Sequence, residues 1–137
     1  MFTREEIVAA ALEVVRLDGL PALSARRVAE RLGSSTAPVY SNFRNMAELE
    51  VAVKTAAVDV LLRYAKRRQP ANTFLDMGLG VLDFAREQPR LYAALFLEPP
   101  GSYDPGPLVM ARLLEVMAGL ERLAELPEIE RVRSEEH

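Results

Sequence analysis

The sequence predicts an all-α protein, in which an N-terminal three-helix helix-turn-helix domain is joined by a long helix to a C-terminal helical bundle. Apolar residues recur at helical spacing, as at Ile7, Ala11 and Val14, and glycines and prolines divide the chain into segments of helical length. No segment alternates apolar and polar residues over the length of a strand. We therefore expect a helix-turn-helix domain over residues 1–46 and a second helical domain over residues 47–137.

The first helices begin and end at recognisable capping residues. Thr3 and Glu6 form a capping box that begins the first helix, and Gly19 is expected to end it in the left-handed conformation. Ser24 caps a second helix that runs to Gly33. A short polar turn then leads into a third helix, over roughly residues 36–43.

Four further helices are expected in the rest of the chain. Asn45 and Glu48 form a second capping pair, which begins a long helix that ends near Arg68. The following helices are expected at about residues 73–87, 90–97 and 108–125, with a loop rich in proline and glycine at residues 98–107 and a charged tail after residue 127.

The composition argues against an enzyme and against a metal protein. The chain has no cysteine, and its one histidine, His137, is the last residue. Thiolate metal sites, cysteine nucleophiles and most histidine-based sites are thereby excluded, and no glycine-rich phosphate loop is present. We expect no catalytic residue, no cofactor and no metal. Because neither a long apolar run nor a leader with a cleavage site is found, a cytoplasmic location is expected.

Positive charge gathers in one segment, although the net charge is −3. Between Ser24 and Met46 there are four arginines and one acidic residue. Further basic residues lie at 66–68, and acidic residues gather in the tail at 128–136. A local basic face can bind phosphates on an acidic molecule, so the net charge does not exclude a nucleic-acid partner.

The segment LSARRVAERLGSSTAPVYSNF, residues 23–43, predicts two short helices joined by a tight turn. Gly33 can adopt positive φ at the turn, and Val39 is expected to close a small core with Val28. Pro38 is tolerated because it falls in the first turn of its helix, where backbone N–H groups have no partner within the helix. The outer face of this helix carries compact polar groups that can reach base edges or phosphates.

This segment and its flanks resemble the TetR family of transcriptional regulators. The resemblance covers about residues 3–53 closely, and the helical remainder agrees only in kind. The matching residues are Leu23-Ser24, Val28-Ala29, Leu32-Gly33, Ser35, Val39-Tyr40, Phe43, Asn45 and Glu48-Leu49.

The resemblance implies a homodimeric regulator that binds double-stranded DNA with its N-terminal domain and senses a ligand with its C-terminal domain. The expected function is a repressor released from a palindromic operator by a small apolar or aromatic effector. The motif and the resemblance together give these candidate DNA-binding residues: Ser24, Arg26, Arg27, Ser35, Thr36, Ala37, Pro38, Tyr40, Ser41, Asn42 and Arg44.

Two features depart from the family pattern. Met46 stands where many members carry a phosphate-binding lysine, so one backbone contact is lost or passes to Arg44. The chain is also shorter than most members, in which two further long helices build the dimer interface. It is either part of a longer protein or a reduced member with another interface, and residues 108–126 are expected at or near the dimer seam.

The apolar residues of the C-terminal part have two possible roles, a packed core or the adaptable wall of a ligand cavity. Gly78 and Gly80 mark either a close backbone approach or an ordinary irregularity, and the long helix is expected to be the only element that touches both halves of the chain. The candidate ligand-binding residues are Phe74, Met77, Leu82, Tyr92, Phe96, Met110, Leu113 and Met117.

Two other classes of function remain open at this point. The apolar C-terminal helix also suits a helical protein-interaction module without sequence-specific DNA binding, and a sequence-independent DNA coat is a further alternative. Salt-dependent DNA affinity and competition with random DNA distinguish these alternatives from a regulator.

Overall fold

The computed structural model describes residues 1–67, 74–98 and 103–125, and the side chains of the last helix as far as Gly119. This part of the chain is all-helical, as the sequence predicts. Arg68, Pro70, Thr73, much of the expected loop and the charged tail lie outside the described residues. The elements are α1 (Arg4–Asp18), the short 3₁₀ helix η1 (Leu20–Ala22), α2 (Ala25–Leu32), α3 (Ala37–Asn42), α4 (Met46–Ala65), α5 (Phe74–Glu87), α6 (Pro89–Phe96) and α7 (Gly106–Glu125).

The predicted caps of the first helices are present. Thr3 and Glu6 form a reciprocal capping box, in which each side chain accepts a hydrogen bond from the other residue's backbone N–H. Gly33 ends α2 in the left-handed conformation, with φ 67° and ψ 35°. Gly19 differs from the expectation, because its φ of 90° and ψ of 163° lie in an extended region open almost only to glycine. Leu20–Ala22 then form η1, a turn that the sequence does not predict.

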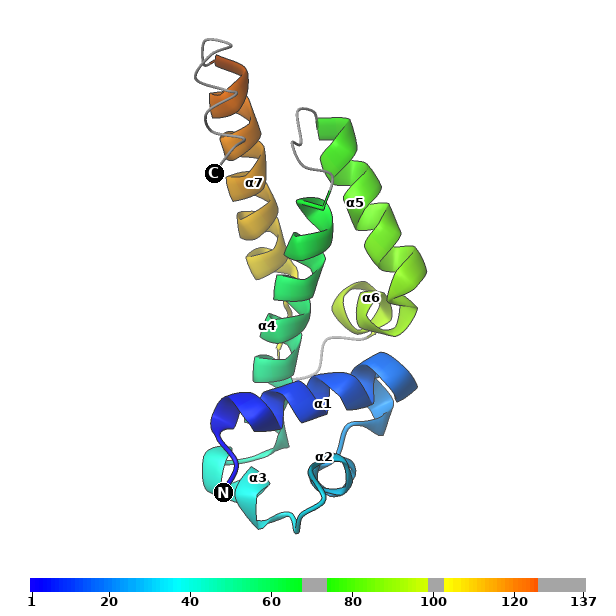
Figure 1. Ribbon diagram of the computed structural model, residues 1–137, viewed down its shortest axis with the longest axis vertical. Helices are drawn as coiled ribbons and strands as arrows, with labels where there is room; N and C mark the ends of the chain where they lie inside the picture. The colour runs from blue at the N-terminus through cyan, green and yellow to red at the C-terminus, as the bar shows by residue number, and fades with distance from the viewer. Residues whose placement is uncertain (68–73, 99–102, 126–137) are drawn as a thin grey trace.

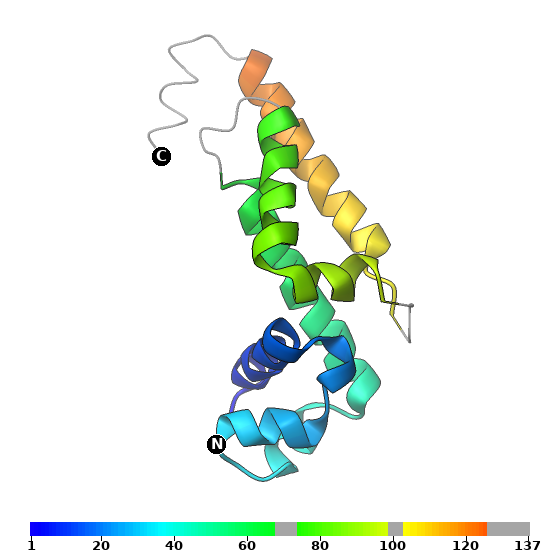
Figure 2. The same ribbon diagram turned by 90° about the vertical axis from the view of Figure 1, so that its right-hand side faces the viewer.

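The long helix α4 forms the spine of the molecule (Figure 1). Helix α1 crosses the lower part of α4, and α2 and α3 lie beyond α1 at the N-terminal end. Helices α5 and α7 run along α4 on different sides of it, as the view from the side also shows (Figure 2). The molecule thus has two parts. The head consists of α1, η1, α2 and α3, and the body consists of α4, α5, α6 and α7.

The short helix α6 corrects the expectation that α4 alone touches both halves of the chain. It packs against α1 of the head as well as against α4 and α5 of the body. Leu91 and Leu95 of α6 are buried in the same hydrophobic cluster as Val14 and Val15 of α1. The head and the body therefore share a continuous core, joined along two routes.

Several helix ends differ from the sequence prediction by one to three residues. Helix α4 ends at Ala65 rather than near Arg68, and the N–H of Arg67 donates to the carbonyl of Tyr64 at 3.1 Å, which tightens the turn after the helix. Helix α6 begins at Pro89, at a first-turn position where its missing N–H costs nothing. Helix α7 begins at Gly106, whose N–H donates to Oδ1 of Asp104 at 2.9 Å.

The two glycines of α5 have different surroundings. A Cβ on Gly80 would collide with the backbone carbonyl oxygen of Tyr64 in α4 and would lie 2.9 Å from its carbonyl carbon. At Gly78 a Cβ would meet nothing within 4 Å. Of the two alternatives that the sequence leaves open, a close backbone approach is therefore found at Gly80, where α5 meets α4, and not at Gly78.

Candidate nucleic-acid interface

Helix α2 is fixed at both of its ends. The Oγ of Ser24 accepts a hydrogen bond from the backbone N–H of Arg27 at 3.1 Å, which caps the start of the helix. At the other end, the N–H groups of Gly33 and Ser34 return to carbonyls in the last turn of α2, and the left-handed Gly33 turns the chain toward α3. The angle between α2 and α3 is thus set by local backbone bonds.

The start of α3 is held by its own backbone and by one serine. The carbonyl of Thr36 accepts from the N–H groups of Val39 and Tyr40 at 3.0 and 3.2 Å. The Oγ of Ser35 accepts from the N–H of Ala37 at 3.3 Å. Pro38 lies in the first turn, as predicted, so its missing N–H leaves no gap in the helix ladder.

Helix α3 has a buried face and an exposed face. Val39 is 1% exposed and packs with the fully buried Val28 of α2. On the opposite side Ala37 and Ser41 are exposed, and Tyr40 keeps 58% of its surface accessible. A small core thus holds a short helix with its outer face presented to solvent, which is the geometry that major-groove reading needs.

Two of the predicted reading residues bind to their own helix in this structure. The hydroxyl of Ser41 donates to the carbonyl of Ala37 at 2.9 Å. The Nδ2 of half-buried Asn42 donates to the carbonyl of Pro38 at 2.8 Å. To contact DNA, both side chains must exchange these bonds or form additional ones. The Tyr40 side chain is already exposed to solvent.

Arg4 secures the far end of α3, a role that sequence reasoning missed. Its guanidinium donates to the carbonyl of Asn42 at 3.2 Å and lies 4.3 Å from the ring centroid of Phe43. It also approaches the carboxylate of Glu48 at 3.6 Å. One side chain thereby links the starts of α1 and α4 to the end of α3. No local pattern signals this link, because Arg4 and Asn42 are 38 residues apart.

The predicted arginines divide into free and engaged side chains. Arg26, at the start of α2, is 86% exposed, and its nearest acid is Glu30 at 3.4 Å. Arg27 instead forms an ion pair with Asp18 of α1, which ties α2 to α1. Arg44 is exposed, and within the described residues its guanidinium has no ion-pair partner. Arg26 and Arg44 are the cations best placed for phosphates.

The structure places the predicted ligand-binding residues in unlike environments. Met77 is 5% exposed and belongs to the core, and Tyr92, Leu113 and Met117 are half-buried. The ring of Tyr92 lies between Phe84 and Phe96, at centroid distances of 6.5 and 4.9 Å. The other four are exposed, namely Phe74, Leu82, Phe96 and Met110.

A shared cavity for these eight residues stays a prediction. Those on α5 and those on α7 lie on different sides of α4 (Figures 1 and 2). The sequence pattern marks residues as apolar without saying which of them are covered, so the exposed positions look the same as core positions.

Neither a metal centre nor a membrane span is found in the part of the chain that the structure describes. No group of three or more histidine, cysteine or acidic residues gathers there. Among the described helices, none combines the length and the apolar character that crossing a bilayer requires.

Comparison with known proteins assigns the head. Residues 7–53 match the family model described as bacterial regulatory proteins, tetR family. This match covers α1, η1, α2, α3 and the first part of α4. A search of the curated proteins finds no match to the chain. The chain is therefore a DNA-binding transcriptional regulator, in which residues 7–53 form the N-terminal helix-turn-helix domain of the tetR family.

Proposed function

We propose that the protein is a repressor, which binds a palindromic operator as a homodimer and leaves it when a small apolar effector binds to the C-terminal helices. The observation that carries this proposal is the two-faced α3, with Val39 buried and Tyr40 exposed. A repressor of this kind acts in the cytoplasm, where the operator lies. Catalysis has no part in the proposal.

In the proposed complex α3 enters the major groove. Thr36, Ala37 and Tyr40 are placed toward the DNA, with Ser41 and Asn42 reaching base edges after exchanging their bonds to the helix backbone. Phosphates are bound by Arg26, by Arg44 and by the start of α2, where Ser24 retains a hydroxyl hydrogen to donate. Arg27 contributes by holding α2 on α1 through Asp18.

A palindrome requires two heads at a fixed separation. Recognition helices of dimeric helix-turn-helix proteins lie about 34–36 Å apart, or a multiple of that distance, on one face of the duplex. Exposed apolar side chains on the body support self-association, since Met110 and Leu114 of α7 keep 59% and 54% of their surface accessible. We place α7 at or near the dimer seam.

The effector is proposed to bind where the body is apolar and incompletely covered. Met110 and Met117 of α7 offer flexible, polarisable side chains that adapt to different ligand shapes. Such a ligand releases the operator only if it prefers a state in which the heads are wrongly spaced. Both α4 and α6 connect the body to the head, and the coupling needed is modest, about 1–3 kcal/mol.

The DNA part of this proposal can be tested through the salt dependence of binding. Arg26→Gln should weaken DNA binding and flatten the dependence of log K on log salt by about one unit, because one phosphate contact is lost. Arg90→Gln is the matched control, since Arg90 is an exposed arginine of α6 that is not among the candidate DNA-binding residues. Equal losses in both variants, or a slope unchanged in Arg26→Gln, would contradict the assignment of Arg26.

A further inference from the structure

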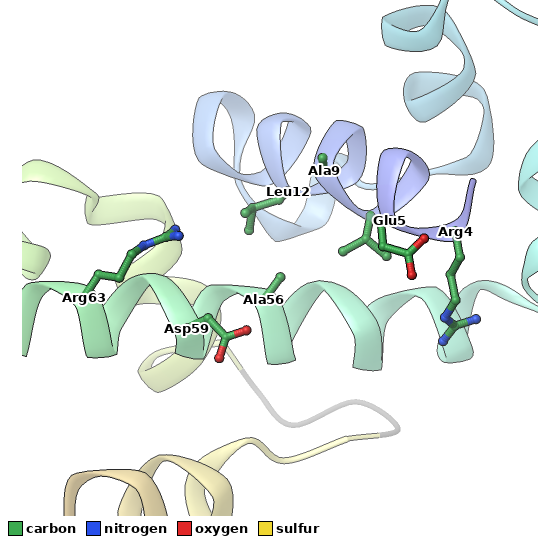
Figure 3. A pocket seen from close by; sticks show the side chains of 8 residues that line it. Arg4, Glu5, Ala9, Leu12, Ala56, Asp59 and Arg63 are labelled. Carbon is green, nitrogen blue, oxygen red and sulfur yellow. The ribbon is translucent and has the colours of Figure 1, made fainter. Parts of the chain in front are cut away.

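An open groove lies in the angle between α1 and α4, outside the residues proposed above for DNA and for the effector (Figure 3). Its volume is about 330 Å³, within the range of about 300–1,000 Å³ that is usual for small-molecule sites. Val8, Ala9 and Leu12 of α1 line it together with Ala56 of α4. Ala9 and Ala56 carry the shortest side chains of the lining, so a larger side chain at either position would narrow the groove.

The two ends of the groove differ in their charge. At the end near the N-terminus of α1, the Arg4 guanidinium is engaged by Glu48, the Asn42 carbonyl and the Phe43 ring, and Glu5 lies beside it. At the other end stand Asp59 and Arg63 of α4, which also line the groove and are both exposed. Of the two guanidinium groups in the lining, the one of Arg63 is therefore the one that no described ion pair engages.

Arg63 does not use the acidic partner nearest to it in sequence. Asp59 lies four residues earlier on the same helix, a spacing at which ion pairs commonly form. No Asp59–Arg63 ion pair is present among the described contacts, although both residues line the groove, and Figure 3 shows the Arg63 side chain directed toward α1 and the Asp59 carboxylate directed away from α1. The exposed Arg63 guanidinium thus lies at one end of the groove, and among the described residues no hydrogen bond or ion pair to it is found.

We propose that this groove binds an amphipathic monocarboxylate, with the apolar body of the ligand on Ala9, Leu12 and Ala56 and its carboxylate on Arg63. Arginine suits this role because its planar donors match the two oxygens of a carboxylate. A cationic ligand would have to place its charge near Arg63 or reach Glu5 beside Arg4, so the anionic class fits the groove better. The binding step requires neither the DNA contacts nor the effector site proposed above.

The probe is octanoate below its micellar concentration, compared with 1-octanol and octylammonium of the same chain length. Binding is measured by calorimetry on the full chain, and the site is located by amide chemical shifts in ¹⁵N-labelled protein. We expect saturable octanoate binding, with shifts in the α1 and α4 amides around Ala9 and Ala56. Arg63→Gln should weaken it about tenfold or more, as for loss of a hydrogen bond to a charged group, and Ala9→Leu should weaken it by filling the groove.

Matched controls separate a built site from general adsorption. Arg90→Gln removes an exposed arginine from α6, and Ala111→Leu enlarges an exposed alanine on α7, so both should bind octanoate as the unmodified chain does. Equal octanoate binding by the unmodified chain and Arg63→Gln, equally tight binding of 1-octanol, or preference for octylammonium would overturn the proposal. So would the absence of saturable binding, or shifts confined to α5–α7, a result that would instead favour the effector site in the body.

Discussion

The ammonium of Lys54 donates a hydrogen bond to the carbonyl oxygen of Tyr103 at 3.0 Å, across 49 residues of sequence. Lys54 is 1% exposed, and its charge is balanced by Glu50 one turn earlier on α4, at 2.9 Å. Its neighbour Val53 belongs to the hydrophobic core shared with α1. A single buried cation thereby attaches the segment before α7 to the part of α4 that supports the head.

Replacing Lys54 by methionine should destabilise the protein substantially. The change keeps the length of the side chain but leaves the Glu50 carboxylate and the Tyr103 carbonyl without their donor. Removing one partner of a buried ion pair costs about 3–5 kcal/mol, and the partial exposure of Glu50, at 23%, places the expected loss near the lower end. Urea unfolding measures it, with Lys66→Met as an exposed control at the C-cap of the same helix. A loss no larger than that of the control would show that the buried pair contributes nothing.

The two glycines of α5 should respond in opposite directions to alanine. Gly80→Ala forces a methyl group into the backbone of Tyr64, so α4 and α5 must separate, at a cost of about 1–3 kcal/mol or more. Gly78→Ala meets open space in a helix, and the better helix propensity of alanine should stabilise the protein by up to about 1 kcal/mol. Thermal unfolding of the pair tests the packing of α5 on α4, and similar midpoints for the two variants would contradict it.

Charge placed on α7 should disrupt the proposed dimer. Leu114→Glu puts a carboxylate among the exposed apolar side chains of α7, where a partner helix would have to bury it. Arg112→Glu adds at least as much negative charge on nearly the opposite side of the helix and should leave the assembly intact. Light scattering at high protein concentration provides the measurement. If the unmodified chain is monomeric, or if both variants dissociate equally, the proposal that α7 lies at the dimer interface is contradicted.

Local signals predict the head of this protein well, because its turns depend on residues close in sequence. The Thr3–Glu6 capping box and the Ser24 and Asn45 caps are confirmed. The positive φ of Gly33 is also confirmed. Each of these features depends only on backbone groups that are close in sequence. The conformation of a short turn can therefore be inferred without knowing the rest of the fold.

Contacts between distant segments could not be predicted in the same way. Lys54 occupies an ordinary helix position in the sequence, and only the return of the chain at Tyr103 makes it a buried cation. Arg4 likewise gains its role from Asn42 and Phe43, which meet it only in the folded head. The body presents the same difficulty, since apolar periodicity marks Phe74 and Met77 alike although one is exposed and the other is buried.

The central claim, that α3 reads DNA, is tested most directly by selecting bound duplexes from a random-sequence library and measuring their affinity for Tyr40→Ala. The account predicts enrichment of an inverted repeat, with half-sites about one helical turn apart or a multiple of that spacing. It also predicts that Tyr40→Ala binds the selected duplex more weakly, while its circular dichroism and thermal midpoint stay those of the unmodified chain. No enriched sequence, or full affinity of a correctly folded Tyr40→Ala, would contradict the claim.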